Sequence, residues 1–322
     1  MDILITGAAG YIGSHTANEL QNLGYNAIAL DNLSNGHREA LHPSIPFYLT
    51  DIRDKNSLRE IFAKHKFSYV IHLAGLAIVE ESFSREKDYE ENNIIGTKNI
   101  LSCCKEFKVS NLIFSSSSTI YGDVNGRGKL KETDKQRAIN PYGRTKLACE
   151  ELICHSKINY IILRYFNVAG ARQDLTNGPR GQGSQRLFFH LAKAAIEDRP
   201  FNINGHDYPT NDGTCVRDYI HVEDIADIHI ACLKYFKKNF TSLILNCGYE
   251  EGFSIHQIVE NFEKYNNVKI QKKTAPRRQG DPAYLVGDTQ LLKQHLNWKS
   301  RFEDPLKEIC VSTYQWMKRQ HE

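Results

Sequence analysis

Residues 6–13 read TGAAGYIG, and they join a short apolar run at residues 2–6 to an amphipathic stretch. Gly7 permits a tight turn, Gly10 lets the backbone approach a pyrophosphate, and Gly13 allows a helix and a strand to pack closely. The free N–H groups and the dipole at the start of the expected helix favour an anion there. This spacing of glycines therefore predicts a dinucleotide-binding turn of the Rossmann type.

A second sign of dinucleotide binding is a carboxylate that follows the glycine turn. Asp31 ends the second apolar run, 18 residues after Gly13, where an acidic side chain can bind the ribose hydroxyls of adenosine. The next residues are Asn32 and Leu33, and no arginine follows that would accept a 2′-phosphate. The two motifs together predict NAD rather than NADP, and they outweigh the alternative of a glycine-rich turn without a ligand.

Short apolar runs alternate with amphipathic stretches over the first two-thirds of the chain, as in a parallel sheet flanked by helices. The runs do not alternate polar with apolar residues, which is typical of strands buried on both faces. We expect strands at residues 2–6, 26–30, 47–50, 69–73, 111–115 and 159–164. We expect helices at residues 11–23, 57–65, 89–107 and 142–155. The pattern predicts an α/β fold with a doubly wound parallel sheet and ligands at the carboxyl ends of its strands.

Beyond residue 168 the regular alternation of strands and helices ends. The elements expected there are a loop at 168–183, a helix at 185–196, a strand at 217–222, a helix at 223–236, a strand at 243–247, a helix opened by a capping box of Ser254 and Gln257, and a last helix opened by Asp304 and Pro305. We predict a Rossmann-type NAD-binding domain at residues 1–167, rejoined by residues 215–236. Residues 168–322 are predicted to form a smaller α+β domain that binds the substrate.

The composition excludes several classes of protein. The 322 residues carry 41 Lys and Arg against 38 Asp and Glu, and 41% of them are hydrophobic, which argues against nucleic-acid binding and against a disordered chain. No apolar run approaches the ~18 residues of a membrane span, and Met1 leads directly into the first strand without room for a signal peptide. The eight cysteines show no CxxC pair and no metal-ligand spacing. We therefore expect a cytoplasmic protein without a metal, nucleic-acid or membrane partner.

A second group of residues has the chemistry of an acid–base site. Tyr142 and Lys146 are four residues apart in an expected helix, which places them on one face. An ammonium beside a phenol favours the phenolate and lowers its pKa from roughly 10 toward neutrality, so that the tyrosine can act as a general base. Four serines at residues 115–118 follow the fifth expected strand. A Tyr-x-x-x-Lys pair alone is usually ordinary helix surface, but with the nucleotide turn and the serines it predicts a catalytic site.

Several blocks of sequence carry a resemblance to a known family. They are TGAAGYIGSH at 6–15, DNLSNG at 31–36, HLAG at 72–75, FSSSSTIYG at 114–122, NPYGRTKL at 140–147, LRYFNVAGA at 163–171, DYPTNDGTCVRDYIHVEDIAD at 207–227 and APRRQGDPA at 275–283. On these blocks, essentially the whole chain resembles the extended short-chain dehydrogenases/reductases, and specifically the UDP-glucose/UDP-galactose 4-epimerase family. The first and fifth blocks mark the superfamily, whereas the last three are far more specific to the epimerases.

The resemblance assigns expected roles to individual residues. Those matching the catalytic positions are Ser117, Tyr142 and Lys146. Those matching cofactor positions are Gly7, Gly10, Tyr11, Ile12, Gly13, Asp31, Asn32, Asp51, Ile52, Ala74, Gly75, Asn92, Lys146 and Tyr165. Those expected to bind the UDP-sugar are Asn167, Arg186, Leu187, Arg217, Arg278, Asp281 and Leu285. Two arginines with planar forks suit the oxygens of a diphosphate.

The implied activity is the interconversion of UDP-glucose and UDP-galactose at C4 through a transient 4-keto intermediate, with NAD as a resident cofactor. Tyr142 would take the proton of the sugar 4-hydroxyl, Ser117 would hydrogen-bond the same oxygen, and Lys146 would hold the nicotinamide ribose. UDP would anchor the substrate while the hexose turns. The resemblance also implies a homodimer formed through helices beside the catalytic one.

Four positions depart from the family pattern. Ala77 stands where many members carry a lysine that contacts the cofactor phosphate, Arg186 where asparagine is frequent, and Asn204 where an aromatic is frequent. The missing cation suggests that this protein loses NAD more readily than its relatives. Leu285 stands where a bulky tyrosine can gate the hexose pocket, so either UDP-N-acetylhexosamines are also accepted or Leu285 is only a packing residue.

Three alternative functions share parts of this pattern. A nucleotide-sugar 4,6-dehydratase needs an acidic pair after the catalytic threonine, whereas residues 117–120 read SSTI with no carboxylate before Asp123. A decarboxylase acting on UDP-glucuronate would use the same scaffold. A non-catalytic NAD-sensing protein would keep the glycine turn but often lose the Tyr/Lys pair, and Tyr142 and Lys146 are both present.

Overall fold

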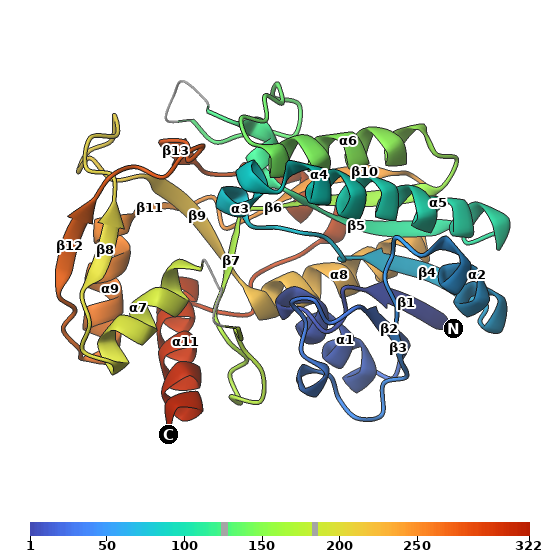
Figure 1. Cartoon of the computed structure of the whole chain (residues 1–322), viewed down its shortest axis with the longest axis horizontal. Helices are drawn as coiled ribbons and strands as arrows, with labels where there is room; N and C mark the ends of the chain where they lie inside the picture. The colour runs from blue at the N-terminus through green and yellow to red at the C-terminus, as the bar shows by residue number, and fades with distance from the viewer. Residues whose placement is uncertain (124–127, 182–185) are drawn as a thin grey trace.

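The computed structural model describes residues 1–123, 128–181 and 186–322. In Figure 1 a large sheet with helices on both faces occupies the right of the molecule, and a smaller part containing α7, α9 and α11 lies on the left. The strands of the large sheet run in the order β10-β6-β5-β4-β1-β2-β3, and every neighbouring pair is parallel. The seven strands are β1 (Asp2–Thr6), β2 (Asn26–Asp31), β3 (Phe47–Leu49), β4 (Phe67–His72), β5 (Asn111–Ser117), β6 (Asn159–Tyr165) and β10 (Leu243–Cys247). The predicted doubly wound parallel sheet is confirmed.

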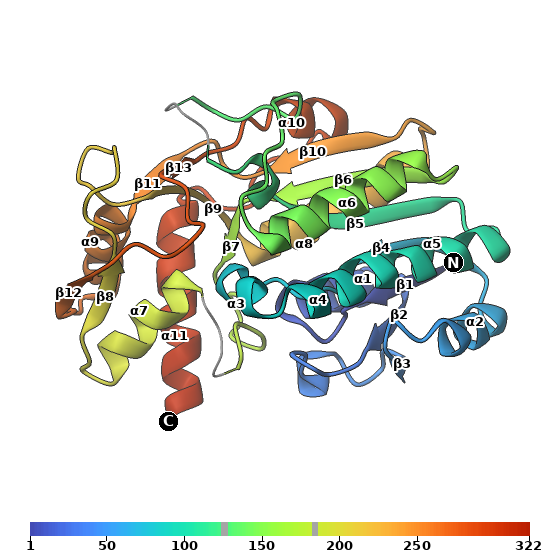
Figure 2. The same cartoon turned by 45° about the horizontal axis from the view of Figure 1, so that its top comes forward.

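Helices cover both faces of this sheet because its strands are apolar on both sides. Ile3 and Ile5 of β1 belong to the core under one face, and Leu4 between them belongs to the core under the other. The helices of the first face are α1 (Tyr11–Asn22), α8 (Val222–Phe236) and α10 (Gln290–Leu296), and those of the second are α2 (Lys55–Lys64), α5 (Gly96–Glu106) and α6 (Pro141–His155). Figure 2 shows α5 and α6 in front of the strands and α1 behind them.

The smaller part has its own sheet and core. In its four-stranded sheet β9 is the centre, paired with β7, β11 and β13, and a separate parallel pair joins β8 to β12. The strands are β7 (Asn167–Ala169), β8 (Phe201–Asn204), β9 (Val216–His221), β11 (Gly252–Ser254), β12 (Lys272–Ala275) and β13 (Tyr284–Leu285), and the helices are α7 (Leu187–Ile196), α9 (Ile255–Asn266) and α11 (Pro305–His321). Phe188, Ile258, Phe262 and Ile309 are buried between them.

The chain passes between the two parts in a way that corrects the predicted division. β9 begins the segment 215–236 that was expected to rejoin the large part, but it pairs within the small sheet, and only α8 after it packs on the large one. β10 lies within the predicted substrate domain at 168–322, yet it extends the large sheet beside β6. β10 is a short apolar run, whereas β9 reads VRDYIH and mixes apolar with charged residues. Neither pattern shows which strand will be its neighbour.

The helix predicted at 89–107 is interrupted. The structure has α3 (Val79–Ser84) and α4 (Glu86–Tyr89), then a π-helical turn at Glu90–Ile95, and then α5. A π-helical turn often marks a functional site, and here it turns Asn93 toward the loop after β4. The predicted loop at 168–183 begins with the end of β7, and the helix predicted at 185–196 begins at Leu187. Residues 182–185 lie outside the described residues.

Side-chain caps open α6, α9 and α11, and two of these starts, at Ser254 and at Asp304, confirm the predictions. Asn140 accepts a hydrogen bond from Gly143 N at the start of α6, and Asp304 accepts one from Lys307 N at the start of α11. Ser254 and Gln257 form the expected capping box. In the same described part of the chain, no helix is both long and apolar enough to span a membrane. The described residues also hold no cluster of three His, Cys, Asp or Glu side chains suited to a metal ion, and all eight cysteines are unpaired.

Candidate active site

The turn after β1 and the loop after β4 meet at the point where the strand order reverses, which is where parallel α/β sheets bind ligands. Gly7 has a φ of +69°, and a Cβ built on it would lie 2.5 Å from Ala74 N. Ala74 N donates to Thr6 Oγ1 at 3.3 Å, and Leu73 N donates to Thr6 O at 3.0 Å. Because the two backbones are in contact, only glycine fits at position 7.

The first turn of α1 fits an anion. Its N-cap residue is Gly10, which has no side-chain oxygen to accept from the N–H groups of the helix start. A Cβ on Gly13 would collide with the carbonyl of Gly7, so the third glycine lets the helix start lie against the turn. Tyr11 and Ile12 are the first two helical residues, and their N–H groups belong to this free end. A glycine turn and an uncapped helix start thus lie where the pyrophosphate is predicted to bind.

The residues predicted for adenosine lie at the ends of β2 and β3. Asp31 is buried and accepts hydrogen bonds from Ala9 N at 3.0 Å and from Leu33 N at 2.8 Å. Burial raises the pKa of its carboxyl, and these backbone hydrogen bonds oppose that shift. Asn32 Nδ2 donates to Asp51 Oδ2 at 2.9 Å. The guanidinium of Arg53 lowers the pKa of Asp51 to about 2. Ile52, which stands between these two residues, packs into the core.

One buried amide fixes the loop after β4, and the sequence does not reveal it. Asn93 Oδ1 accepts from Leu76 N at 2.8 Å, and Asn93 Nδ2 donates to Thr145 Oγ1 of α6 at 2.9 Å. A Cβ on Gly75 would lie 3.1 Å from Asn93 Oδ1 and 3.5 Å from Lys146 Nζ. The predicted cofactor residue Asn92 lies beside it on the same π-helical turn, half-buried. Two adjacent asparagines look alike in sequence, and only the turn decides which one is buried.

The three predicted catalytic side chains meet at the carboxyl end of β5. Ser117 is its last residue, and its Oγ accepts from Thr119 Oγ1 at 3.0 Å. Tyr142, 8% exposed in the first turn of α6, lies close enough to Ser117 for the serine hydroxyl to lower the pKa of the phenol. Lys146 is 4% exposed, and its Nζ donates to Ser115 O at 2.7 Å. The structure thus brings phenol, hydroxyl and ammonium to one place.

The pKa of Tyr142 differs from the prediction. Burial raises it to about 12, whereas the hydrogen bond from Ser117 lowers it. The expectation that Lys146 brings the phenol close to neutrality is wrong for this arrangement, because the desolvation of a buried phenol exceeds the effects that favour the phenolate. Burial also lowers the pKa of Lys146 to about 8, although the nearby Cys149 and Glu150 act in the other direction.

Tyr165 ends β6 opposite Ser117 in the register of the sheet. Its hydroxyl is 2.9 Å from His229 Nε2 of α8, and burial raises the pKa of the phenol. The hydroxyl is therefore engaged with α8. Contact of this residue with the cofactor remains a prediction.

The residues predicted for the UDP group form a charged cluster in the smaller part. Arg217 of β9 is buried, is ion-paired with Asp281, and donates to Pro282 O at 2.5 Å. Arg217, Asp281 and Arg278 all act on the pKa of Cys215, which burial raises. Asn167 Nδ2 of β7 donates to the Asp218 carbonyl at 2.9 Å, and the Asn204 amide, with its oxygen turned toward Arg278, accepts from Nε at 3.0 Å.

Arg186 and Leu285 have neighbours that bear on their predicted roles. Arg186 Cζ lies 4.3 Å from the ring centroid of Tyr11, a residue predicted for the cofactor. Leu187 follows it as the first residue of α7, partly buried. Leu285 is 4% exposed and packs with Ile120 and Phe166, which adjoin the predicted catalytic and substrate residues.

Comparisons with known proteins agree with this geometry. The model of the NAD dependent epimerase/dehydratase family matches residues 3–248. UDP-glucose 4-epimerase of Lacticaseibacillus casei is 37% identical over 98% of this chain and 96% of its own. The crystal structure of UDP-glucose 4-epimerase from Stenotrophomonas maltophila with bound NAD and formylated UDP-arabinopyranose has a TM-score of 0.94 at 34% identity, covering 100% of this chain and 99% of that one. The UDP-Glc/GlcNAc 4-epimerase of Campylobacter jejuni has a TM-score of 0.83 at 36% identity, covering 99% of each chain. The chain therefore belongs to the NAD-dependent epimerase/dehydratase family, and within it to the UDP-glucose 4-epimerase family.

Proposed function

We propose that this protein interconverts UDP-glucose and UDP-galactose by inverting C4 of the hexose. The observation that carries the proposal is the meeting of Ser117, Tyr142 and Lys146 at the sheet edge that also holds the glycine turn. The similarity to UDP-glucose 4-epimerases over nearly the full chain supports it.

The cofactor is NAD, on which the family depends. The residues of this structure fit it, because the cradle at Gly7 and Gly10 has no side chain and Asp31 is followed by no arginine that would accept a 2′-phosphate. When bound, NAD supplies a hydride acceptor beside the sugar and a positive charge on its nicotinamide ring.

The proton chemistry belongs to Tyr142. It takes the proton of the hexose 4-hydroxyl, and Ser117 donates a hydrogen bond to the same oxygen. With a pKa of about 12 the phenol is protonated at neutral pH, so positive charge nearby is needed to make it a base. Lys146, whose pKa is about 8, is largely charged at pH 7 and lies one helical turn further along α6.

The substrate is anchored through its UDP group, away from the reacting carbon. We assign this anchor to Asn167, Arg217, Arg278 and Asp281, together with Leu187. Asp281 fixes the Arg217 fork by an ion pair, which keeps its remaining donors oriented toward a diphosphate. Binding energy from this remote group holds the nucleotide while the 4-keto hexose turns over within the site.

A product assay without added NAD tests the function. The purified protein is incubated with UDP-glucose, and UDP-galactose is measured by chromatography. We expect UDP-galactose to form up to an equilibrium mixture with no net consumption of NAD. Formation of a 4-keto-6-deoxy sugar would instead identify a dehydratase, and loss of carbon dioxide in a parallel incubation with UDP-glucuronate would identify a decarboxylase. No turnover of either substrate would favour an NAD-sensing protein.

We further propose that UDP-N-acetylhexosamines are substrates, because Leu285 leaves more room than a tyrosine would. The likeness to the Campylobacter jejuni UDP-Glc/GlcNAc enzyme supports this. Leu285→Tyr is expected to lower kcat/KM for UDP-N-acetylglucosamine about tenfold or more relative to UDP-glucose, since an overfilled pocket rejects the larger sugar. Leu285→Met, which keeps the volume, is the control. An unchanged ratio of the two activities would show that Leu285 only packs against Ile120 and Phe166.

We also propose a homodimer that uses helices beside α6, and a cytoplasmic location. The eight unpaired cysteines suit a reducing compartment. Light scattering of the purified protein at several concentrations tests the assembly.

A further inference from the structure

The side chain of Tyr11 connects the cofactor turn to the smaller part of the molecule. Tyr11 is the first residue of α1, directly after the N-cap Gly10. Its hydroxyl donates to Gly170 O at 2.5 Å, and Arg186 Cζ lies 4.3 Å from its ring centroid. Arg186 is the N-cap residue of α7. One aromatic ring thus lies between the pyrophosphate cradle and a guanidinium that begins a helix of the UDP-binding part.

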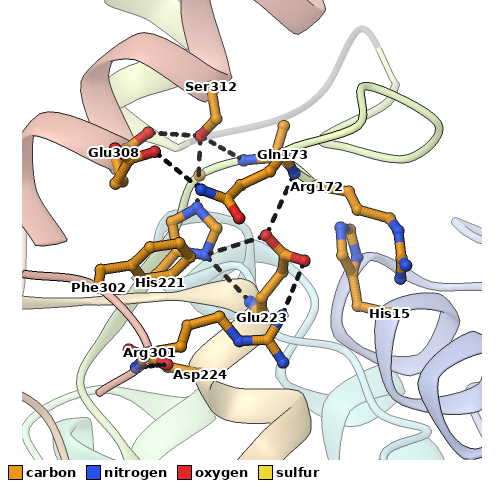
Figure 3. Close-up of polar contacts among 12 residues, drawn as sticks. His15, Arg172, Gln173, His221, Glu223, Asp224, Arg301, Phe302, Glu308 and Ser312 are labelled. Carbon is orange, nitrogen blue, oxygen red and sulfur yellow. Dashed lines mark hydrogen bonds and ion pairs between the residues drawn. The ribbon is translucent and has the colours of Figure 1, made fainter.

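The Gly170 carbonyl, which accepts the hydrogen bond from the Tyr11 hydroxyl, is itself held in place. Gly170 begins the segment 170–181, which is hydrogen-bonded to helices of both parts. The Ala171 amide donates to Ser312 Oγ of α11 at 3.1 Å, and Gln173 N donates to Glu223 Oε2 of α8 at 3.2 Å. Figure 3 shows this polar cluster, with Glu223 between the segment and the neighbouring helices. The ring of Tyr11 is therefore held in one position.

The same segment also returns to α1. Asn177 Nδ2 donates to Ser14 Oγ at 2.9 Å, one turn after Tyr11. Near the other end of the segment, Trp316 Nε1 of α11 donates a hydrogen bond to Pro179 O at 2.9 Å. The first turns of α1 and the helix α11 are thus joined through one short segment.

The charge of Arg186 suits the cofactor. The guanidinium of Arg186 is half-buried beside Tyr11, and its planar, permanently charged fork is suited to phosphate oxygens. The stacked ring of Tyr11 favours the cation through its π-face. The NAD pyrophosphate carries two negative charges and belongs at the N-terminus of the helix that Tyr11 begins. The loop after β4, residues 73–77, reads LAGLA and supplies no cation to the pyrophosphate.

We propose that Arg186 completes the NAD pyrophosphate site from the smaller part, and that it couples NAD binding to UDP-sugar binding; this rests on the proposed function. Arg186 is the N-cap of α7 and Leu187 its first residue, so a ligand that fixes this end of the helix also fixes the guanidinium over Tyr11. The coupling is reciprocal, because linkage requires each ligand to change the affinity for the other by the same factor. The cation that is missing at Ala77 is supplied by Arg186.

The experiment follows NAD release and UDP binding separately from turnover. Protein loaded with NAD is dialysed with or without UDP, and the NAD that remains bound is measured by absorbance. The dissociation constant of UDP is measured by calorimetry on NAD-loaded and NAD-depleted protein. For the wild type we expect UDP to slow NAD release, and NAD to tighten UDP, by about fivefold or more.

Arg186→Gln is expected to lose NAD about tenfold faster than the wild type, with the UDP effect on release abolished. Tyr11→Leu, which keeps the backbone N–H groups but removes the ring, is expected to abolish the coupling as well. Ala77→Lys in the Arg186→Gln background is expected to restore NAD retention without restoring the coupling, because it adds a cation from the other side. Arg199→Gln removes an exposed arginine near the end of α7 and serves as the matched control. Urea unfolding of each variant verifies that it is folded.

Two outcomes would overturn the assignment. If Arg186→Gln weakens UDP binding but leaves NAD release unchanged, Arg186 is a substrate residue alone. If the wild type itself shows no coupling between UDP and NAD, the connection through Tyr11 has no functional effect. A failure of the proposed function would be detected in a separate experiment, because the product assay of the wild type would then yield no UDP-galactose.

Discussion

Tyr142→Phe is expected to lower kcat for UDP-glucose by about 10³-fold, with KM changed only a few-fold. The phenylalanine ring retains the edge contact with Tyr89, whose centroid is 6.3 Å away, but the substitution removes the phenol oxygen whose pKa Ser117 lowers. General acid–base catalysis by one side chain typically contributes 10²–10⁴-fold, so its loss appears in kcat. The measurement is steady-state kinetics of UDP-galactose formation, with bound NAD quantified for each preparation.

Tyr89→Phe is the control for this prediction. Tyr89 is also a buried tyrosine, but its hydroxyl bonds to the backbone of Ile78, accepting from N at 2.9 Å and donating to O at 2.6 Å. Its removal is expected to lower stability while kcat stays within a few-fold of the wild type. A loss of less than tenfold in Tyr142→Phe, with NAD fully bound, would mean that another group takes the proton.

Acid is expected to destabilise the fold steeply below pH 6.5. Burial lowers the pKa of His15 and of His229 to about 4, and the pKa of His72 to about 3. The unfolded chain takes up these protons near pH 6.5, whereas the folded protein does not until its own lower pKa is reached. Each such histidine therefore lowers the free energy of unfolding by about 1.4 kcal/mol for each pH unit in that window.

The contribution of His72 can be isolated by comparing slopes. His72 is buried between Thr6 Oγ1 at 2.7 Å and Thr97 Oγ1 at 3.0 Å. We expect His72→Asn to reduce the slope of unfolding free energy against pH, between pH 6 and pH 4, by about 1.4 kcal/mol per unit. Urea unfolding in excess NAD gives the slope, and His206→Asn, at an exposed position, is expected to leave it unchanged. A His72→Asn slope equal to that of the wild type would disprove the assignment.

The total slope is smaller than the sum over the histidines. Burial raises the pKa of Asp218 to about 7, so its folded form holds a proton that the unfolded form releases above about pH 4. This carboxyl stabilises the fold as the pH falls, opposite in sign to the histidines, and its effect is lost as the pH rises through 7. Comparing variants at each pH cancels this common contribution.

Local signals in the sequence were sufficient for six of the seven strands of the large sheet and for the residue types of the site. The first six strands and their helices follow from apolar runs, glycine positions and caps such as Asn140, because these features act over a few residues. They were insufficient for β10 and for the π-helical turn at Glu90–Ile95. Strand partners and the break in that helix depend on contacts with Tyr165 and its neighbours in β6, and with Leu76 and Thr145, which are distant in sequence.

The sequence by itself predicted the glycine turn, NAD as the cofactor, and the grouping of Ser117, Tyr142 and Lys146, because each prediction depends on residue type and short spacing. Only the tertiary structure decided how these groups behave. Burial moves the pKa of Tyr142 upward to about 12, since desolvation depends on everything packed around the phenol. The contact of Arg186 with Tyr11 joins residues 175 positions apart, and no local pattern specifies which side chain a distant helix start will meet.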